Sequence, residues 1–400
     1  RTNLKILKEE AEEDGYNDNM VSITVQRDHL LQGFCDLQSQ DWSAATGLNV
    51  EYEGENSTGD GLRRSYLNDV TLELMDPHRA LLSGSLRPGE VPQGDHKHRV
   101  LPCSASSTNP DHLAFFEMMG RLLAIAILHG ECLPLRLKFP FLKQLLNRPL
   151  ELEDLELVDA DLYNNKIKPI LAYSPEELAA CDLYFVDEET ALGHTKETEL
   201  VELGSGLQVS TANRKEYVNL LCNHLLTANI KEQTEAVRKG VLNVIPEVLW
   251  NAMSRCLSAE DLDEIIAGKE ALDLGDWQEH TIYEAGYTAE SEQVVWFWEL
   301  LQGWDSAQQS QLLRFVTGSA AVSTAGFEHL QGYSGQEHKF TIQRGETPSA
   351  GAVWDFPTAS SCFNKLILPP YETQADFNDK VTFVAMHGSQ TAFDENAVAV

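Results

Sequence analysis

Basic residues are scarce in this sequence of 400 residues. Lys and Arg number 30 against 62 Asp and Glu, so the formal net charge is −32. Nucleic acids and anionic membranes both bind clustered cations, and this charge balance therefore argues against either as a partner. The acidic excess has two possible explanations: the chain binds a basic protein partner, or the charge serves only to keep the chain soluble.

Cysteine pairs at metal-binding spacing are missing. The seven cysteines are odd in number and widely spaced, and no C-x-x-C pair occurs. Structural zinc sites and the disulfide frameworks of small secreted domains need regularly spaced cysteines, so neither is predicted. His96 and His98 have no matching Cys or His pair, so no metal site is predicted there. Reduced cysteines indicate the cytosol or the nucleus.

No hydrophobic run is long enough to predict a membrane span. The longest apolar stretch, residues 113–128, is interrupted by Glu117 and Arg121, which can pair on one face of a helix. The sequence begins with Arg1 and has no signal-like start, which indicates a piece of a longer chain. The hydrolase and protease motifs G-x-S-x-G and H-E-x-x-H are missing too, as is any Gly-rich phosphate loop.

What the sequence does have is the composition of a globular protein with two or three domains. Hydrophobic residues make up 42% and charged residues 23% of the chain, enough to build a sizeable core. Up to residue 267 the hydrophobic periodicity is mainly helical. Helices are predicted at residues 109–129, 139–146, 162–171, 214–226, 232–244 and 258–267. A hairpin is predicted from residues 198–203 and 207–210 around a Gly-Ser-Gly turn.

The pattern changes at Gly268, which interrupts the helical periodicity before Asp273. Beyond residue 274 the chain mixes helices with short strands. A strand is predicted at residues 363–368, and Thr373 is placed to cap a final helix. The sequence thus predicts a larger helical part and a smaller α+β part, with a candidate hinge between them.

Cys362 differs from the other cysteines in its surroundings. Small polar residues precede it, and a strand that ends in Pro-Pro follows it, in the segment FPTASSCFNKLILPPY. A thiol in a Ser-rich loop is accessible, and acyl transfer needs a thiolate that can reach a thioester carbonyl. On spacing alone, an ordinary free thiol is the commoner explanation. The other six cysteines lie mostly in apolar patterns, which predicts core or neutral positions.

Around Cys362 the sequence resembles the active-site segment of HECT-type ubiquitin ligases. The resemblance extends from about Val25 to Phe393, with similar segments in the family's order and spacing. The segments are VQRDHLL at Val25, EYEGE at Glu51, NPDHLAFFEMMGRLLAIAILHG at Asn109, LELEDLELVDADLY at Leu150, NRKEYVNLL at Asn213, LDLGDWQEHTIYEAGY at Leu272, VVWFWELLQG at Val294, LLRFVTG at Leu312 and GFEHLQG at Gly326. Nine segments in order are far more specific than one motif, and they favour a catalytic role for Cys362.

The resemblance implies a bilobal HECT fold of the α+β class, with a mainly helical N-terminal lobe and a smaller α+β C-terminal lobe that carries Cys362. Within the N-terminal lobe, a small subdomain would dock a ubiquitin-conjugating enzyme. The implied parts are an upstream linker or helix (1–24), the N-terminal lobe (25–267) with its docking subdomain (151–228), the hinge (268–273) and the C-terminal lobe (274–400).

The resemblance also implies the reaction and its partners. Cys362 would accept ubiquitin from the conjugating enzyme as a thioester, and a lysine of a substrate protein would then take it, with no metal or organic cofactor. Four residues at family positions are candidates for the conjugating-enzyme groove, with core packing as the alternative for each: Leu162, Ile167, Tyr217 and Leu221. Phe393 corresponds to a tail phenylalanine that is a candidate for docking between the lobes.

Several positions depart from the family pattern. Ser360 and Ser361 stand where the family usually has His and Thr, so no role of that histidine transfers to this chain. Residues 60–66 are a degenerate form of G-G-x-x-R-E-W in which Arg64 is kept, and the tail beyond Phe393 is longer than usual.

Two alternatives to a ligase follow from these observations. The departures favour a degenerate HECT domain that binds ubiquitin or a conjugating enzyme without catalysis, whereas the presence of Cys362 favours catalysis. A cysteine hydrolase would need a histidine close to Cys362 in space, and the nearest in sequence are His338 and His387.

Overall fold

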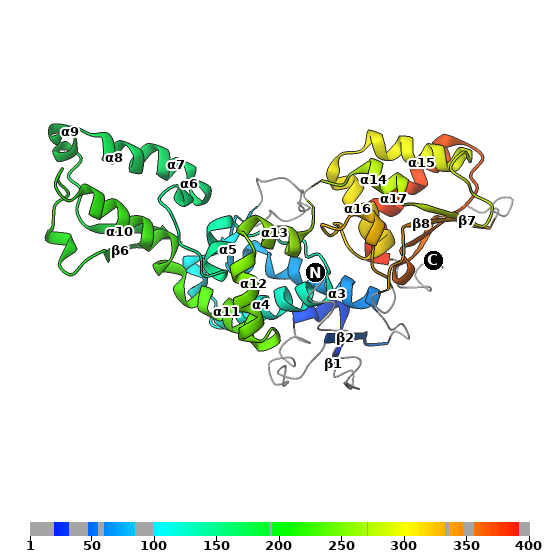
Figure 1. The fold of residues 1–400 in the computed structure, drawn as a ribbon, viewed down its shortest axis with the longest axis horizontal. Coiled ribbons are helices and arrows are strands. Elements are labelled where there is room, and N and C mark those ends of the chain that lie inside the picture. The colour runs from blue at the N-terminus through cyan, green and yellow to red at the C-terminus, as the bar shows by residue number, and fades with distance from the viewer. Residues whose placement is uncertain are drawn as a thin grey trace.

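The structure is a computed structural model that describes residues 20–31, 47–54, 60–84, 99–191, 194–269, 271–332, 336–346 and 356–391. Its buried hydrophobic side chains form three separate clusters, which lie within residues 21–266, 155–226 and 277–385. We name the three corresponding bodies the large subdomain, the small subdomain and the C-terminal lobe. Figure 1 shows the large subdomain in the middle, with the small subdomain and the C-terminal lobe at opposite ends. The combination of many helices with small sheets confirms the predicted α+β class.

The large subdomain is built around the apolar helix α4, whose side chains are buried over most of its length. Its elements are β1 (Met20–Val25), η1 (Arg27–His29), β2 (Gly47–Tyr52), α3 (Asp60–Leu74), η2 (Pro77–Arg79), β3 (Leu82–Ser83), β4 (Leu101–Pro102), η4 (Ser104–Thr108), α4 (His112–His129), α5 (Phe139–Leu145), α11 (Lys231–Val244), α12 (Glu247–Cys256) and α13 (Ala259–Ala267). The predicted boundary at residue 25 is wrong. The strand β1, which pairs in parallel with β2, begins before residue 25. Val21 and Ile23 in it are buried in the core, and exposed residues alternate with them.

Helices α4 and α11 cross with their backbones in contact. A Cβ atom at Gly120 would lie 2.0 Å from the carbonyl oxygen of Val237, and one at Gly240 would lie 1.8 Å from the carbonyl oxygen of Glu117. Only glycine fits at either position, so these two residues set the distance between the helices. By length and composition α4 could cross a membrane, but its packing makes it the core helix of the large subdomain.

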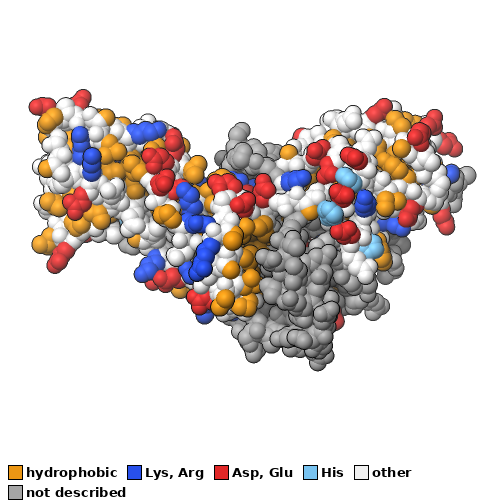
Figure 2. Space-filling model, in the orientation of Figure 1, with side chains coloured by type: hydrophobic (Ala, Val, Ile, Leu, Met, Phe, Trp, Pro, Cys, Tyr) orange, Lys and Arg blue, Asp and Glu red, His pale blue; other side chains and the backbone are white. Residues whose placement is uncertain are grey.

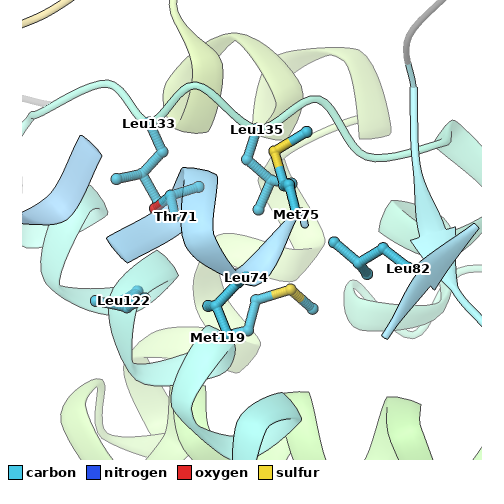
Figure 3. Close-up of a pocket in the computed structure, with 8 residues that line it drawn as sticks. All are labelled: Thr71, Leu74, Met75, Leu82, Met119, Leu122, Leu133 and Leu135. Carbon is cyan, nitrogen blue, oxygen red and sulfur yellow. The ribbon is translucent and has the colours of Figure 1, made fainter. Parts of the chain in front are cut away.

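Helix α3 is also fixed firmly to this core. Figure 3 shows side chains from α3, α4, β3 and the segment after α4 converging on one point, with no room left for a water molecule between them. The converging side chains are Thr71, Leu74, Met75, Leu82, Met119, Leu122, Leu133 and Leu135. Close packing of this kind resists displacement, so α3 presents its opposite face to the C-terminal lobe as a rigid surface.

The small subdomain consists of short helices and one hairpin. Its elements are α6 (Asp154–Val158), α7 (Ala160–Leu162), the π-helix η5 (Tyr163–Ile167), α8 (Lys168–Ala172), α9 (Pro175–Ala180), β5 (Val186–Ala191), β6 (His194–Glu199), η6 (Gly204–Gly206), α10 (Arg214–Leu226) and η7 (Ala228–Ile230). The hairpin predicted around residues 204–206 is wrong, because the paired strands are β5 and β6. The Glu199 carboxylate accepts hydrogen bonds from the amide and the hydroxyl of Ser205, which folds the Gly-Ser-Gly segment into a helical turn instead.

The C-terminal lobe packs helices against a four-stranded sheet of order β7-β8-β10-β9. Its elements are α14 (Leu274–Glu279), β7 (Ile282–Glu284), α15 (Glu292–Gly303), α16 (Ser306–Thr317), η8 (Phe327–His329), β8 (Thr341–Arg344), β9 (Thr358–Ser360), η10 (Ser361–Phe363), β10 (Lys365–Leu368) and α17 (Gln374–Thr391). Trp277 lies at the centre of this core, stacked on Phe327 at 4.8 Å between ring centroids and edge-on to Phe340.

The two lobes are joined through Gly268, which follows α13. Its φ of +76° lies in the range that favours glycine, and a Cβ atom there would lie 2.6 Å from the carbonyl oxygen of Val322. The Gly268 carbonyl accepts a hydrogen bond of 2.9 Å from Arg136 Nη2, and the amide of Lys269 donates to Val322 at 2.9 Å. The break in periodicity that the sequence predicts at Gly268 therefore falls where the backbone is hydrogen-bonded to Arg136 of the large subdomain and to Val322 of the C-terminal lobe.

Candidate active site at the tip of a hairpin

Cys362 lies at the tip of the hairpin formed by β9 and β10. The two strands pair antiparallel with Ser360 opposite Lys365, and η10 forms the turn between them. Asn364 closes the turn in the left-handed conformation, with φ 50° and ψ 40°, which asparagine tolerates better than most residues. At this turn Cys362 is half-buried.

The side chain of Asn364 holds this turn against the rest of the lobe. It is fully buried, and its Nδ2 donates to the carbonyl oxygens of Gln331 at 2.9 Å and His338 at 2.7 Å. The carbonyl oxygen of Asn364 accepts from the amide of Thr341 at 3.0 Å. The turn that carries the thiol is thus tied to two neighbouring segments.

The start of helix α3 forms one wall beside the thiol. A Cβ atom at Gly61 would lie 2.6 Å from Ser361 Oγ and 3.2 Å from Cys362 Sγ. The backbone of the large subdomain therefore reaches the turn of Cys362, and a side chain at position 61 would force the Ser361 hydroxyl to move.

Further along α3, three side chains contact the C-terminal lobe. Arg64 Nη1 donates to the carbonyl oxygen of Thr317 at 2.8 Å and to Asn364 Oδ1 at 3.3 Å. Asn68 Nδ2 donates to the carbonyl oxygen of Gly318 at 2.9 Å. Asp69 forms an ion pair with Arg314, although burial raises the pKa of this carboxyl. One face of α3 thus contacts both the end of α16 and the turn of Cys362.

Of the two histidines considered for a hydrolase, His338 lies beside the turn of Cys362, because a Cβ atom at Gly332 would be 2.5 Å from His338 Cδ2 and 2.7 Å from the Cys362 carbonyl oxygen. The His338 ring packs edge-on against Phe363 at 5.4 Å between centroids, and His387 lies against Phe383 at 4.9 Å. Within the described residues neither forms a hydrogen bond with Cys362 Sγ, and no group of three or more His, Cys, Asp or Glu gathers as a metal site would. His338 is thus a neighbour of the Cys362 turn that packs on Phe363 and is not hydrogen-bonded to the thiol.

Exposure does not by itself distinguish Cys362 from the other cysteines. Cys181 and Cys256 are exposed at the ends of α9 and α12, contrary to the predicted core or neutral positions. Cys132 and Cys222 are buried as expected, and burial raises the pKa of the Cys222 thiol to about 11. What sets Cys362 apart is the tight turn that presents it beside α3.

Comparison with known proteins decides the family. The model of the HECT domain (ubiquitin-transferase) matches residues 68–394, which include Cys362, Gly268 and the small subdomain. This chain belongs to the HECT family. The resemblance inferred from the nine segments is thereby confirmed, although the matched region begins inside α3 rather than at Val25.

Individual HECT proteins cover most of the chain. Human E3 ubiquitin-protein ligase NEDD4 is 32% identical over 335 residues, which are 84% of this chain and 24% of NEDD4. Drosophila melanogaster E3 ubiquitin-protein ligase Smurf1 is 34% identical over 341 residues, 84% of this chain and 30% of Smurf1. RSP5 of Chaetomium thermophilum is 31% identical over 367 residues, 90% of this chain and 42% of RSP5. The HECT chain described here spans less than half the length of these three relatives.

Three of the four predicted groove residues are core residues of the small subdomain. Ile167, Tyr217 and Leu221 have exposed fractions of 0%, 1% and 0%. A side chain without exposed surface cannot contact a partner, so their prediction as contact residues is corrected to core packing. Leu162 is partly buried against the same core and stays a predicted contact. Phe393 lies outside the described residues.

The apolar surface that the sequence did not reveal consists of leucines in turns and on a helix flank. Leu157, Leu203 and Leu207 are exposed by 52%, 76% and 43%. Their sequence signal is weak, because single leucines among polar residues also occur on ordinary surfaces. They are considered further because they lie in the small subdomain of a HECT domain.

Replacing Tyr217 by alanine is expected to cost about 3–5 kcal/mol of unfolding free energy, because a fully buried ring packed edge-on against Phe185 at 5.4 Å would be lost. Urea denaturation followed by far-UV circular dichroism measures this, because none of the seven tryptophans lies in the small subdomain. Tyr184→Ala, at a half-buried tyrosine of the same subdomain, is the control and should cost less than about 1 kcal/mol. Equal stabilities of the two variants would contradict the core assignment.

Proposed function

We propose that this HECT domain is a ubiquitin-protein ligase that carries ubiquitin as a thioester on Cys362. The observation that supports the proposal most directly is the half-exposed thiol at the tip of the β9–β10 hairpin, inside the region that matches the HECT family. The proposed compartment is the cytosol or nucleus, where a catalytic thiol stays reduced.

The proposed reaction has two steps. The Cys362 thiolate attacks the thioester carbonyl between a conjugating enzyme and the ubiquitin C-terminus, a new C–S bond forms, and the conjugating enzyme leaves as a thiolate that takes up a proton. A lysine amine of the substrate then attacks the new thioester. An amide bond forms, the C–S bond to Cys362 breaks, and the amine gives its proton to the solvent or to the departing thiolate.

We propose the small subdomain as the docking site of the conjugating enzyme. In support, hydrophobic side chains gather between charged ones on the visible face of the small subdomain in Figure 2. Three leucines of this subdomain, Leu157, Leu203 and Leu207, are exposed. Exposed apolar side chains are frequent at protein contact sites, and removal of the central ones weakens binding most. Leu162 is a further candidate at the edge of the same core.

The double variant Leu203→Ser/Leu207→Ser is expected to slow the loading of Cys362 about tenfold, because two apolar contacts with the conjugating enzyme are lost. Both side chains are exposed, so the melting temperature should change little. Val248→Ser is the control, since Val248 is 84% exposed on α12 in the large subdomain. Loading at the wild-type rate in the double variant would rule these two leucines out of the docking site.

A loading assay tests the proposed function as a whole. The chain is incubated with activating enzyme, a panel of conjugating enzymes, ATP and labelled ubiquitin, and is then run on gels with and without a reducing agent. A ligase gives a band that the reducing agent removes and that free lysine discharges much faster than water does. Rapid loss to water would indicate a hydrolase, and the absence of the band with every conjugating enzyme would indicate a binding module.

A further inference from the structure

The contact between Arg64 and Asn364 joins the two lobes directly behind the catalytic thiol. Asn364 lies two residues after Cys362, and Arg64 belongs to α3 in the other lobe, 300 residues earlier in the chain. Both side chains are buried, with exposed fractions of 6% for Arg64 and 0% for Asn364. A hydrogen bond from a charged donor in a buried site is stronger than one between neutral groups.

Arg64 is itself held by an anion of the large subdomain. Glu131 Oε1 accepts hydrogen bonds from Arg63 Nε at 3.1 Å and Arg63 Nη2 at 2.8 Å, and it lies 3.8 Å from Arg64 Nε. The carboxylate therefore holds the Nε side of Arg64, while Nη1 points at acceptors in the C-terminal lobe. Arg64 thus has an acidic neighbour in its own lobe on one side and acceptors in the C-terminal lobe on the other.

Asn364 has two functions that use different atoms. Its Nδ2 holds the turn through the carbonyl oxygens of Gln331 and His338, which belong to the same lobe. Its Oδ1 accepts from Arg64, which belongs to the other lobe. The hydrogen bonds of Nδ2 lie within the C-terminal lobe and move with it. The hydrogen bond of Oδ1 with Arg64 exists only when the lobe lies against α3.

The places of the small subdomain and the C-terminal lobe determine whether the contact between Arg64 and Asn364 can exist during loading or during transfer. In Figure 1 the small subdomain and the C-terminal lobe lie at opposite ends of the large subdomain. If the conjugating enzyme docks on the small subdomain, Cys362 must leave α3 to be loaded, and the contact with Arg64 must break. Discharge to a lysine has no such requirement, and in the present arrangement Cys362 is a partly exposed residue.

We propose that Arg64 is a positioning residue for the second step. By binding Asn364 Oδ1 and the carbonyl oxygen of Thr317 together, it holds the turn of Cys362 in one orientation while a lysine amine attacks the thioester. Asn364 positions the same turn in both steps through its Nδ2. The inference rests on the proposed ligase function and adds to it the residue that distinguishes transfer from loading.

The test measures the two steps separately in Arg64→Lys. Lysine keeps the positive charge beside Glu131, which protects the fold, but it cannot reach two acceptors with a planar fork. We expect loading from the conjugating enzyme within about twofold of the wild-type rate, and discharge of preloaded chain to free lysine slower by about tenfold. Asn364→Asp, which loses both Nδ2 donors, should slow both steps. The control is Arg121→Lys, at an equally buried arginine whose partner Glu117 lies on the same helix α4.

Melting temperatures of all variants accompany the rates. The inference is overturned if Arg64→Lys slows loading as much as discharge, if it changes neither step, or if it only speeds loading, which would mark the contact as a resting position. Arg121→Lys with the same selective loss of discharge would overturn it as well. Failure of the wild-type chain to form any thioester, scored in the same gels, would instead reject the proposed function and the inference with it.

Discussion

Replacing Cys362 by alanine is expected to reduce ubiquitin transfer below detection while the chain stays folded. The alanine has no nucleophile, so the thioester cannot form, and a half-buried position at a turn tip contributes little packing. Cys362→Ser should accumulate an oxyester, because a serine ester reacts more slowly with amines than a thioester does. The oxyester band resists reducing agent and is removed by hydroxide. Loading gels and a thermal melt of each variant give both results.

The two exposed cysteines provide the matched controls for Cys362. Cys181→Ala and Cys256→Ala remove thiols that are more exposed than that of Cys362, and neither residue lies in the C-terminal lobe. Both variants should load and transfer at the wild-type rate. A reducible ubiquitin band that persists in Cys362→Ala and disappears in one of these variants would show that another cysteine is the nucleophile.

Gly240→Ala is expected to destabilise the chain strongly, since a Cβ atom added at Gly240 would make the shortest contact of any at the described glycines. The new Cβ would lie 1.8 Å from the carbonyl oxygen of Glu117 and 3.0 Å from the amide nitrogen of Arg121, both backbone atoms that cannot rotate away. Helices α4 and α11 would have to separate along their crossing. Overpacking in cores typically costs 1–3 kcal/mol, and a clash with backbone should cost about 3 kcal/mol or more.

The same substitution at Gly303 provides the control for Gly240→Ala. Gly303 is the last residue of α15, and a Cβ there would meet nothing within 4 Å. Alanine has a higher helix propensity than glycine, so Gly303→Ala should change the unfolding free energy by less than about 1 kcal/mol, in the stabilising direction. Urea denaturation of both variants measures the difference. A Gly240→Ala chain as stable as the wild type would mean that the two helices are farther apart than described.

Local patterns in the sequence predicted the parts of the fold that depend on local chemistry. The helix predicted at residues 109–129 is α4, which ends at His129 because Gly130 adopts φ 66° there. Ser258, the first residue of the helix predicted at 258–267, caps α13 by accepting a hydrogen bond from the amide of Asp261. Helix caps and C-terminal glycines interact with residues within one helical turn, so they can be recognised in the sequence without knowledge of the tertiary structure.

The features that the sequence did not reveal depend on distant residues. The helical periodicity of residues 214–226 places Tyr217 and Leu221 on one apolar face, but a core face and a binding face have the same periodicity. The turn at residues 204–206 depends on the Glu199 carboxylate, and the turn of Cys362 is held by Asn364 through the carbonyl oxygens of Gln331 and His338, which lie 33 and 26 residues away in the chain. No local pattern encodes either contact, and the resemblance to HECT ligases supplied only the family and its lobes.

The bonds around Gly268 have a consequence for the kinetics of the lobes. Rotation about this residue must break the hydrogen bonds from Arg136 to Gly268 and from Lys269 to Val322, and it must move a glycine that is packed against the Val322 carbonyl. A tether without such contacts would let the lobe diffuse on the nanosecond timescale, whereas breaking several bonds together creates a barrier. The C-terminal lobe is therefore expected to exchange between discrete positions in microseconds to milliseconds, a regime that relaxation-dispersion NMR detects and that sets an upper limit on the rate of each ubiquitin transfer.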